Sequence, residues 1–375
     1  MLVQHKELNF AGQHVYVALD AHKWSWQVAI MVNDLFHKMF CQNPEPALLV
    51  KYLHRQFPGA RYYCVYEAGY CGFWIYDQLR ALGVDCIVIN PADVPTTDKE
   101  KRTKTNKVDA RKLVRSLHNG ELTPLYVPSR TAREDRSLVR VRRSVVSKQT
   151  RCKNQIKALL SFYGVVVPDD LAERYWPRRY VAYLEQMQFS CASGTQTLQV
   201  LLTELAHYRS SLLTLTRLIR QLATRDSYAL QVRHLVGIDG ISTITAMILL
   251  TELVDVARFQ SLDDLASYVG LVPGEDSSGD ERIITGITER KNPHLRWILI
   301  ECAWVAVRKD PVLMQDFLLL TKRMPKGRAI IRIARKVLNR IRFVLKNNQP
   351  YVTRKIPATV ASPAATVAPC ENRMR

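Results

Sequence analysis

Three acidic residues follow apolar runs in the first third of the chain. Asp20 comes directly after the run VYVAL, Glu67 follows YYCVY, and Asp109 lies in KTNKVDARKLV, where a helix is expected to begin. Hard divalent cations prefer oxygen ligands, and a pair of Mg²⁺ ions can bridge the attacking and leaving oxygens of a phosphoryl transfer. Taken singly, each acid also fits the role of a cap or a solvated turn residue. Taken together, they predict a metal site for phosphoryl transfer.

The elements that must position these acids are predicted from hydrophobic periodicity. Three β-rich runs between residues 14 and 42 suggest a meander, and a helix is expected to open near Asn43 with Pro44 and Pro46 in its first turn. There follow a strand at 60–69, an amphipathic helix at 71–83, a strand at 85–91 and a helix at 108–117. This order predicts an α/β domain with a mixed sheet covered by helices, in which the strand ends can converge on one edge.

The charge of the chain points to a polyanionic partner. The 375 residues include 54 Lys and Arg against 34 Asp and Glu, a net charge of +20, so nucleic acid is the first candidate. The eight cysteines are scattered without C-x-x-C spacing, which excludes a cysteine zinc site and favours reduced core residues in a cytosolic protein. No run approaches the length of a membrane span and no leader is recognised, so we expect a cytoplasmic, nucleoid-associated bacterial protein without membrane contact.

The middle of the chain, residues 129–230, is predicted to be a basic helical hairpin. In its first helix, 129–163, an apolar stripe of Leu138, Val141, Val145, Ile156 and Leu159 is expected to pack against a second helical block at 195–230. Such a coiled coil can pair with another chain, which favours a homodimer or homotetramer. The opposite face carries candidate nucleic-acid contacts: Arg140, Arg143, Lys148 and Arg151. Tyr and Trp residues at 175–183 are available to stack on unpaired bases.

The region 231–347 is predicted to form a third domain, followed by a disordered tail at 348–375 that is rich in Ala, Pro, Ser and Thr. Its segment VGIDGISTITA predicts a glycine turn, which either presents backbone N–H groups to a phosphate or allows close helix packing. The segment EDSSGDE contains Ser277 and Ser278, and by itself it is also an ordinary polar turn. Basic residues follow, and Arg282, Lys291 and Arg296 are candidate phosphate contacts.

These motifs together resemble a known family. ALDAHK, YEAGYCGFWIYDQL and KTNKVDARKLVRSL resemble the three acidic motifs of the DEDD transposases of insertion-sequence family one-ten, relatives of the Piv and MooV invertases. The segment LASYVGLVPGEDSSGDERIITGITERKNPHLRWILIECA is similar to the second hallmark of the family, a G-L-x-P segment followed by Ser-Gly. Both blocks stand in the expected order, so the resemblance covers roughly residues 14–345.

The resemblance implies an RNase H-like, RuvC-type catalytic domain at 10–128 and a DNA transposase or recombinase that acts through a phosphoserine intermediate. Asp20, Glu67 and Asp109, with Asn106, are implied to hold Mg²⁺, for which Mn²⁺ can substitute. Ser278 is the implied nucleophile and Ser277 the alternative. The implied partners are donor and target DNA and a structured bridge RNA. Two other functions stay open: a RuvC-like nuclease on branched DNA that uses water as its nucleophile, and a decayed transposase that only binds nucleic acid.

Asn106 departs from the family pattern. The resemblance places a second acid there, three residues before Asp109, where both side chains lie on one side of a helix. An amide oxygen can still coordinate Mg²⁺, but it contributes no charge and binds the ion more weakly. This predicts a three-acid variant of the site.

Overall fold

The computed structural model describes residues 9–94, 106–168, 176–278 and 281–352, with the backbone alone for 106–108, 275–278 and 281–285. Contacts divide the chain into two compact units, Met1–Pro128 and Ser129–Arg375. No helix among the described residues combines the length and the apolar character that a membrane crossing needs. The predicted tail beyond residue 352 lies outside the described residues.

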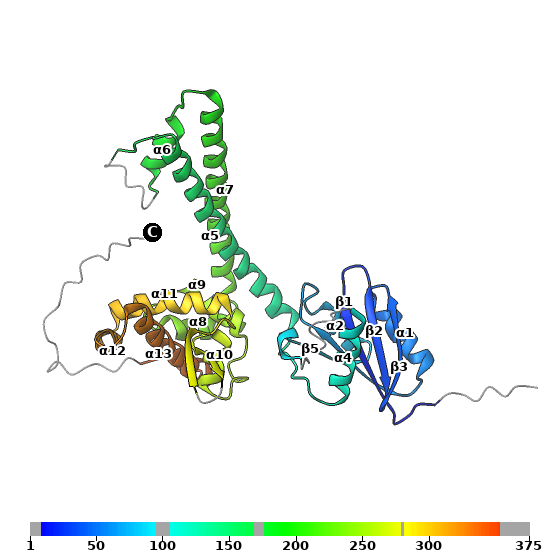
Figure 1. Ribbon diagram of the computed structural model, residues 1–375. Helices are drawn as coiled ribbons and strands as arrows, with labels where there is room; N and C mark the ends of the chain where they lie inside the picture. Colours follow the sequence, from blue (N-terminus) through cyan, green and yellow to red (C-terminus); the bar gives the residue numbers. More distant parts are fainter. Residues whose placement is uncertain (1–8, 95–105, 169–175, 279–280, 353–375) are drawn as a thin grey trace, which may run out of the picture. The chain divides into compact units, whose positions relative to one another are not determined.

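The first unit is built on the mixed sheet that the periodicity predicts (Figure 1). Its strands are β1 (His14–Ala21), β2 (Trp26–Val32), β3 (Leu35–Gln42), β4 (Arg61–Glu67) and β5 (Asp85–Ile89). They lie in the order β3-β2-β1-β4-β5. The first three form an antiparallel meander, and β4 and β5 continue parallel to β1. The carboxyl ends of β1, β4 and β5 therefore share one edge.

Helices cover both faces of this sheet. They are α1 (Pro46–Gln56), α2 (Trp74–Ala81) and α4 (Asn106–His118), and the short 3₁₀ turn η1 (Pro91–Asp93) follows β5. Side chains alternate between faces along each strand, so Leu19 packs with α1 and α2 whereas Ala18 packs with α4. Helix α1 begins with Pro46 at its first turn, as predicted, and Pro44 lies before its N-cap residue Glu45.

A long antiparallel pair of helices begins the second unit (Figure 1). The pair consists of α5 (Arg130–Phe162) and α7 (Ala192–Leu222), with the shorter α6 (Arg178–Gln186) packed near its tip. The two helices pack side by side, but one member of the predicted stripe is wrong. Val141 is 49% exposed, whereas Val139, two residues away on the other side of the helix, is buried. The buried positions continue at Cys152, Ile156 and Leu160, a spacing of four residues that keeps one face inward.

Aromatic residues near the tip fill a core. Trp176 and Tyr180 are buried among side chains of α5, α6 and α7, with their rings 5.0 Å apart. The prediction that aromatic residues of 175–183 stack on unpaired bases is therefore wrong for these two, because neighbouring helices cover their rings.

The rest of the second unit, where the structure describes it, consists of helices, one β-hairpin and their connections. Its helices are α8 (Asp226–Val236), α9 (Thr243–Leu253), α10 (Leu262–Val269), α11 (Pro293–Lys309), α12 (Pro311–Thr321) and α13 (Lys326–Asn347), and its hairpin pairs β6 (Pro273–Ser278) with β7 (Glu281–Ile287). Val139 of α5 and Ile219 and Leu222 of α7 are buried in the same core as α9, α11 and α13. We call the pair α5 and α7 the arm, and the end of it that carries Val139, Ile219 and Leu222 its foot. The foot of the arm is thus part of the C-terminal core.

The cysteines follow the prediction only in part. Cys64, Cys86, Cys152 and Cys302 are buried and free, but Cys41 and Cys191 are exposed. Cys41 lies on the edge strand β3 and Cys191 precedes the first residue of α7, two places where little of the chain covers a side chain.

Candidate active site and nucleic-acid interface

Asp20 and Glu67 lie at equivalent places on neighbouring parallel strands. Leu19 of β1 pairs with Tyr66 of β4, so the next residue on each strand is one of the two acids. Ala18 and Val65, two residues earlier, face α4, and alternation places Asp20 and Glu67 on that same face. The Asp20 side chain is 23% exposed, and its Oδ2 lies 3.1 Å from Nε2 of His22. Glu67 is exposed.

Asp109 lies in the first turn of α4, the helix that covers this face. It is partly buried, and the adjacent Ala110 is fully buried against Ala18 and Val65. Asn106 begins the same helix, but its side chain lies outside the described part of the chain. The first turn of a helix also favours an acid electrostatically, because the peptide dipoles leave partial positive charge there.

A metal-binding set of three side chains is not formed in the described part of the chain. No group of three or more His, Cys, Asp or Glu residues there is arranged to hold a metal ion. The donor chemistry nevertheless fits a hard divalent cation. Mg²⁺ is commonly bound by one or two carboxylates, waters and substrate phosphate oxygens, not by a complete protein cage. Two carboxylates on one face of a sheet edge match that pattern.

The candidate serines lie at the far end of the β6–β7 hairpin. Ser277 pairs with Arg282 and Ser278 with Glu281, the last register positions of the two strands. The side chains of these residues lie outside the description, so the roles of Ser277, Ser278 and Arg282 stay predictions. The described end of the hairpin is anchored. The backbone N–H of Thr288 donates to the Val272 carbonyl at 3.1 Å, and the Arg296 guanidinium donates to the Thr288 carbonyl at 3.0 Å.

A buried carboxylate ties this anchor to the arm. Glu252 is 1% exposed and accepts two hydrogen bonds from Arg140 of α5, at 2.7 and 2.8 Å. The Asn292 amide donates to the same carboxylate at 3.0 Å, while its oxygen accepts from the N–H groups of His294 and Leu295 at the start of α11. One network therefore connects α5, α9 and the start of α11.

The charge state of Glu252 follows from these contacts. Burial alone would raise the pKa of Glu252, but the hydrogen bonds from Arg140 and Asn292 and the charges of Arg140 and Arg136 outweigh it. The pKa of Glu252 therefore lies below its usual value, and the carboxylate stays charged at neutral pH. Sequence reasoning missed Glu252, because a single acid inside the apolar run TAMILLTEL gives no sign of its partner more than 100 residues away.

The structure separates the predicted nucleic-acid contacts into two groups. Arg140, Arg143 and Arg296 make internal hydrogen bonds, Arg143 to the Pro293 carbonyl at 2.9 Å. The side chains of Lys148, Arg151 and Lys291 are exposed. The first group has a structural role whether or not it contacts nucleic acid, so the exposed group carries the prediction more directly.

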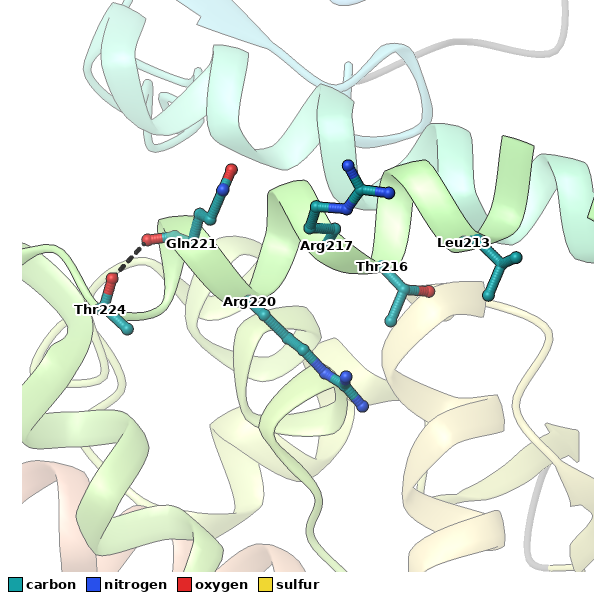
Figure 2. Close-up of a pocket in the computed structure, with 6 residues that line it drawn as sticks. All are labelled: Leu213, Thr216, Arg217, Arg220, Gln221 and Thr224. Atoms are coloured by element: carbon teal, nitrogen blue, oxygen red, sulfur yellow. Dashed lines mark hydrogen bonds between the residues drawn. The ribbon is translucent and has the colours of Figure 1, made fainter. Parts of the chain in front are cut away.

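A basic hollow on α7 was not predicted. It has a volume of about 550 Å³ and is lined by Leu213, Thr216, Arg217, Arg220, Gln221 and Thr224 (Figure 2). Figure 2 shows the hydrogen bond that the Thr224 hydroxyl donates to the Gln221 carbonyl at the C-terminal end of α7. The donor–acceptor distance is 2.8 Å. Thr216 also accepts a hydrogen bond from Arg142 of α5 at 3.1 Å. The pair Arg217 and Arg220, spaced three apart in a helix, is the signal that sequence analysis passed over.

The glycine turn before α9 is explained by packing at one of its two glycines. Gly240 has φ +93°, and a Cβ there would lie 2.5 Å from the Cys302 carbonyl oxygen of α11. Only glycine fits both the backbone angle and this approach. Of the two alternatives for the segment, close helix packing is the one that the geometry of Gly240 supports.

Comparison with known proteins places both candidate regions in one family. A DEDD transposase model matches residues 17–165, which include the three acids, and the model described as "Transposase IS116/IS110/IS902 family" matches residues 232–318, which include both serines. The chain is 35% identical to the putative transposase y4qE of Sinorhizobium fredii, over 65% of this chain and 58% of that relative. It is 25% identical to the transposase for insertion sequence element IS1533 of Leptospira borgpetersenii, over 77% of this chain and 84% of the relative.

The chain thus spans less than two thirds of the length of the Sinorhizobium relative. The two family matches stand in the same order as the two blocks of motifs, and each contains one set of candidate residues. From these matches and these relatives, the chain belongs to the IS110-type family of DEDD transposases.

Proposed function

We propose that this protein is the DNA transposase of an insertion sequence and that it cleaves and rejoins DNA strands through a phosphoserine intermediate. The observation that carries the proposal is the placement of Asp20 and Glu67 on one face of one sheet edge, within a region that matches DEDD transposases. The strand order β3-β2-β1-β4-β5, with an antiparallel meander followed by parallel strands, supports an RNase H-like, RuvC-type assignment for this unit.

The chemistry divides between the two units. The Ser278 hydroxyl attacks a DNA phosphorus, an Oγ–P bond forms, and a bond from phosphorus to a deoxyribose oxygen breaks. That oxygen leaves as a hydroxyl after it takes up a proton, and the serine proton passes to water. The covalent link keeps the energy of the phosphodiester for rejoining. A bound divalent cation, Mg²⁺ or Mn²⁺, would be held by Asp20, Glu67, Asp109 and Asn106 and would stabilise negative charge on the phosphoryl oxygens.

The proposed partners are donor DNA, target DNA and a structured guide RNA. The net charge of +20 supports polyanionic partners, and the family resemblance supports the RNA. A homodimer or homotetramer is proposed because the joining of two DNA molecules needs more than one active site, and the α5–α7 arm offers a surface for pairing.

A covalent trap tests this function. The full-length protein is incubated with Mg²⁺, RNA transcribed from its own locus, and a nicked suicide duplex from the flanking DNA, and adducts are resolved on a denaturing gel. We expect an adduct with the wild type that disappears in Ser278→Ala and persists in Ser277→Ala. An adduct that survives both single variants and the double variant would remove serine from the mechanism. Strand cleavage without any adduct would favour water as the nucleophile.

A further inference from the structure

A groove at the foot of the arm shares no lining residue with either candidate catalytic region. It has a volume of about 530 Å³ and lies where α5, α9 and α11 meet, within the second unit. Pockets that hold small organic ligands run from about 300 to 1,000 Å³, so the groove has room for one flat ring and its substituents. Its floor is apolar and includes Val139, Ile248 and Ile298.

One rim of the groove is a flat, charged stacking surface. Trp297 of α11 is 44% exposed, although large aromatic side chains are usually covered. The Arg143 guanidinium lies 5.1 Å from the centre of the Trp297 ring, and its hydrogen bond to the Pro293 carbonyl fixes it there. An indole next to a fixed guanidinium stacks well on a nucleobase, because every base has a π-face and the cation adds electrostatic attraction.

A second part of the lining favours an anion. Arg142 lines the groove, and its Nε donates to Thr216 at 3.1 Å, which holds the guanidinium in place. Burial lowers the pKa of Arg142, and the nearby charge of Arg220 lowers it further, so a second positive charge acts on this guanidinium. Ser242, the exposed N-cap residue of α9, also lines the groove, so the positive end of a helix dipole opens here.

The charge of the lining decides between possible occupants. Among the twelve described residues that line the groove, two are arginines and none is acidic. A second copy of this basic chain would bring like charge to a basic rim, whereas a nucleic-acid strand brings a phosphate for Arg142 and a flat base for Trp297.

We propose that this groove binds one unpaired nucleotide of a nucleic-acid strand, with its base against Trp297 and Arg143 and its phosphate at Arg142 and the start of α9. The proposal rests on the proposed function only for the choice of nucleic acid as the partner. Thr216, which Arg142 contacts, also lines the hollow of Figure 2, so the groove and that hollow are neighbours at this contact.

Fluorescence anisotropy with a fluorescein-labelled thymidine oligonucleotide tests the groove in the full-length protein. Trp297→Ala removes the stacking surface, and we expect it to weaken binding about tenfold, since base stacking on an aromatic ring contributes about 1–3 kcal/mol. Trp297→Phe keeps a ring and retains most of the affinity. Arg142→Gln removes one phosphate contact, and the slope of log affinity against log salt becomes shallower by about one. Trp304→Ala, at another exposed tryptophan of α11, is the matched control and leaves binding unchanged.

An oligonucleotide of the same length with abasic sites separates stacking from charge. Wild-type protein is expected to bind it as weakly as Trp297→Ala binds the intact strand, and Trp297→Ala is expected to lose nothing further. Equal weakening of a blunt duplex by Trp297→Ala would overturn the proposal, because a paired base cannot enter the groove. If Trp297→Ala changed the oligomeric state seen in light scattering and left oligonucleotide binding unchanged, that result would also overturn the proposal. It would assign the groove to a second copy of the chain.

Failure of the groove and failure of the transposase function give different results. These binding assays contain no Mg²⁺ and no cleavable substrate, so a protein without strand cleavage still reports on Trp297. Conversely, if Trp297→Ala and Trp297→Phe bound the oligonucleotide as tightly as the wild type, the groove would be ruled out as a nucleotide site. The result of the covalent trap assay would not be affected. Circular dichroism of each variant confirms that it is folded.

Discussion

The candidate carboxylates of the first unit and the buried carboxylate of the second unit differ in their exposure to solvent. Asp20 and Glu67 of the first unit lie at a sheet edge where side chains reach solvent, and Glu67 is exposed. Glu252 of the second unit is enclosed, and the Arg140 guanidinium and the Asn292 amide hold both of its oxygens. An edge carboxylate is accessible to an external cation, whereas Glu252 already has its counter-charge inside the protein. Exposure, more than residue type, therefore separates candidate chemistry from architecture.

The largest expected effect concerns the candidate metal-binding carboxylates of the first unit. Asp20→Asn removes a negative ligand but keeps the shape of the side chain, and we expect Mg²⁺-dependent strand cleavage to fall about 1,000-fold, or about 4 kcal/mol in activation free energy. Asp109→Asn is expected to do the same. Cleavage of labelled duplex measures both. Asp34→Asn, an exposed acid of the same unit that contacts His118, is the control and keeps activity. Undiminished cleavage by Asp109→Asn would remove that residue from the proposed metal site.

For Glu252, the enclosed carboxylate, loss of its arginine partner is expected to lower the stability of the protein. Arg140→Met leaves the Glu252 carboxylate buried without its ionic partner, and removal of one partner of a buried pair costs about 3–5 kcal/mol, with the lower end expected because Arg140 is partly exposed. Urea unfolding measures the change. Arg151→Met, at an exposed arginine of the same helix, should change the free energy of unfolding by less than about 0.5 kcal/mol.

A double variant sharpens the same point. Arg140→Met combined with Glu252→Leu removes both charges, and we expect it to recover most of the lost stability. If Arg140→Met proved as stable as Arg151→Met and instead lost nucleic-acid affinity, the main role of Arg140 would be contact with nucleic acid.

Two glycines extend the comparison to the backbone. Gly270, which ends α10, has φ +84°, and a Cβ there would lie 2.5 Å from the Lys291 Cβ and 3.0 Å from the Arg290 carbonyl oxygen. Gly83 has nearly the same φ, +82°, with nothing within 4 Å of a Cβ. Left-handed strain alone costs about 1–2 kcal/mol, so Gly83→Ala measures the strain and Gly270→Ala the strain plus a clash. Urea unfolding should show the larger loss for Gly270→Ala; equal losses would mean that Lys291 moves aside.

The pH dependence of protein stability is a second test of the charge of Glu252, and a smaller effect is expected. Because its pKa is lower in the folded than in the unfolded protein, Glu252 adds stability that is complete above the unfolded pKa and is lost as the pH falls through the folded one. Glu252→Gln should therefore narrow the difference in urea midpoint between neutral and acidic pH. An unchanged pH profile in Glu252→Gln would show that the folded and unfolded pKa values of this group coincide.

The sequence predicted what local pattern determines and missed what distant contacts determine. The strands, the arm helices and the edge position of Asp20 and Glu67 follow from apolar periodicity and strand order, which are properties of neighbouring residues. The partnership of Glu252 with Arg140 joins residues 112 positions apart, and no local pattern records it. The same holds for Val139 in place of Val141, because the face of α5 that is buried depends on where the C-terminal core meets the arm.

The smallest expected effect concerns Asn106, at the start of α4. Asn106→Asp restores the second acid that the family pattern implies, three residues before Asp109. The gain in metal affinity from one more negative ligand is offset in part by repulsion from Asp109, so we expect Mg²⁺-dependent cleavage to stay equal or to rise by less than about tenfold. The informative measurement is the Mg²⁺ concentration at half-maximal cleavage, which should fall in Asn106→Asp. Asn119→Asp, just beyond the other end of the same helix, adds the same charge away from the site and should leave that concentration unchanged. A rise in the half-maximal Mg²⁺ concentration in Asn106→Asp would mean that the amide, and not a carboxylate, is the group this variant of the site requires.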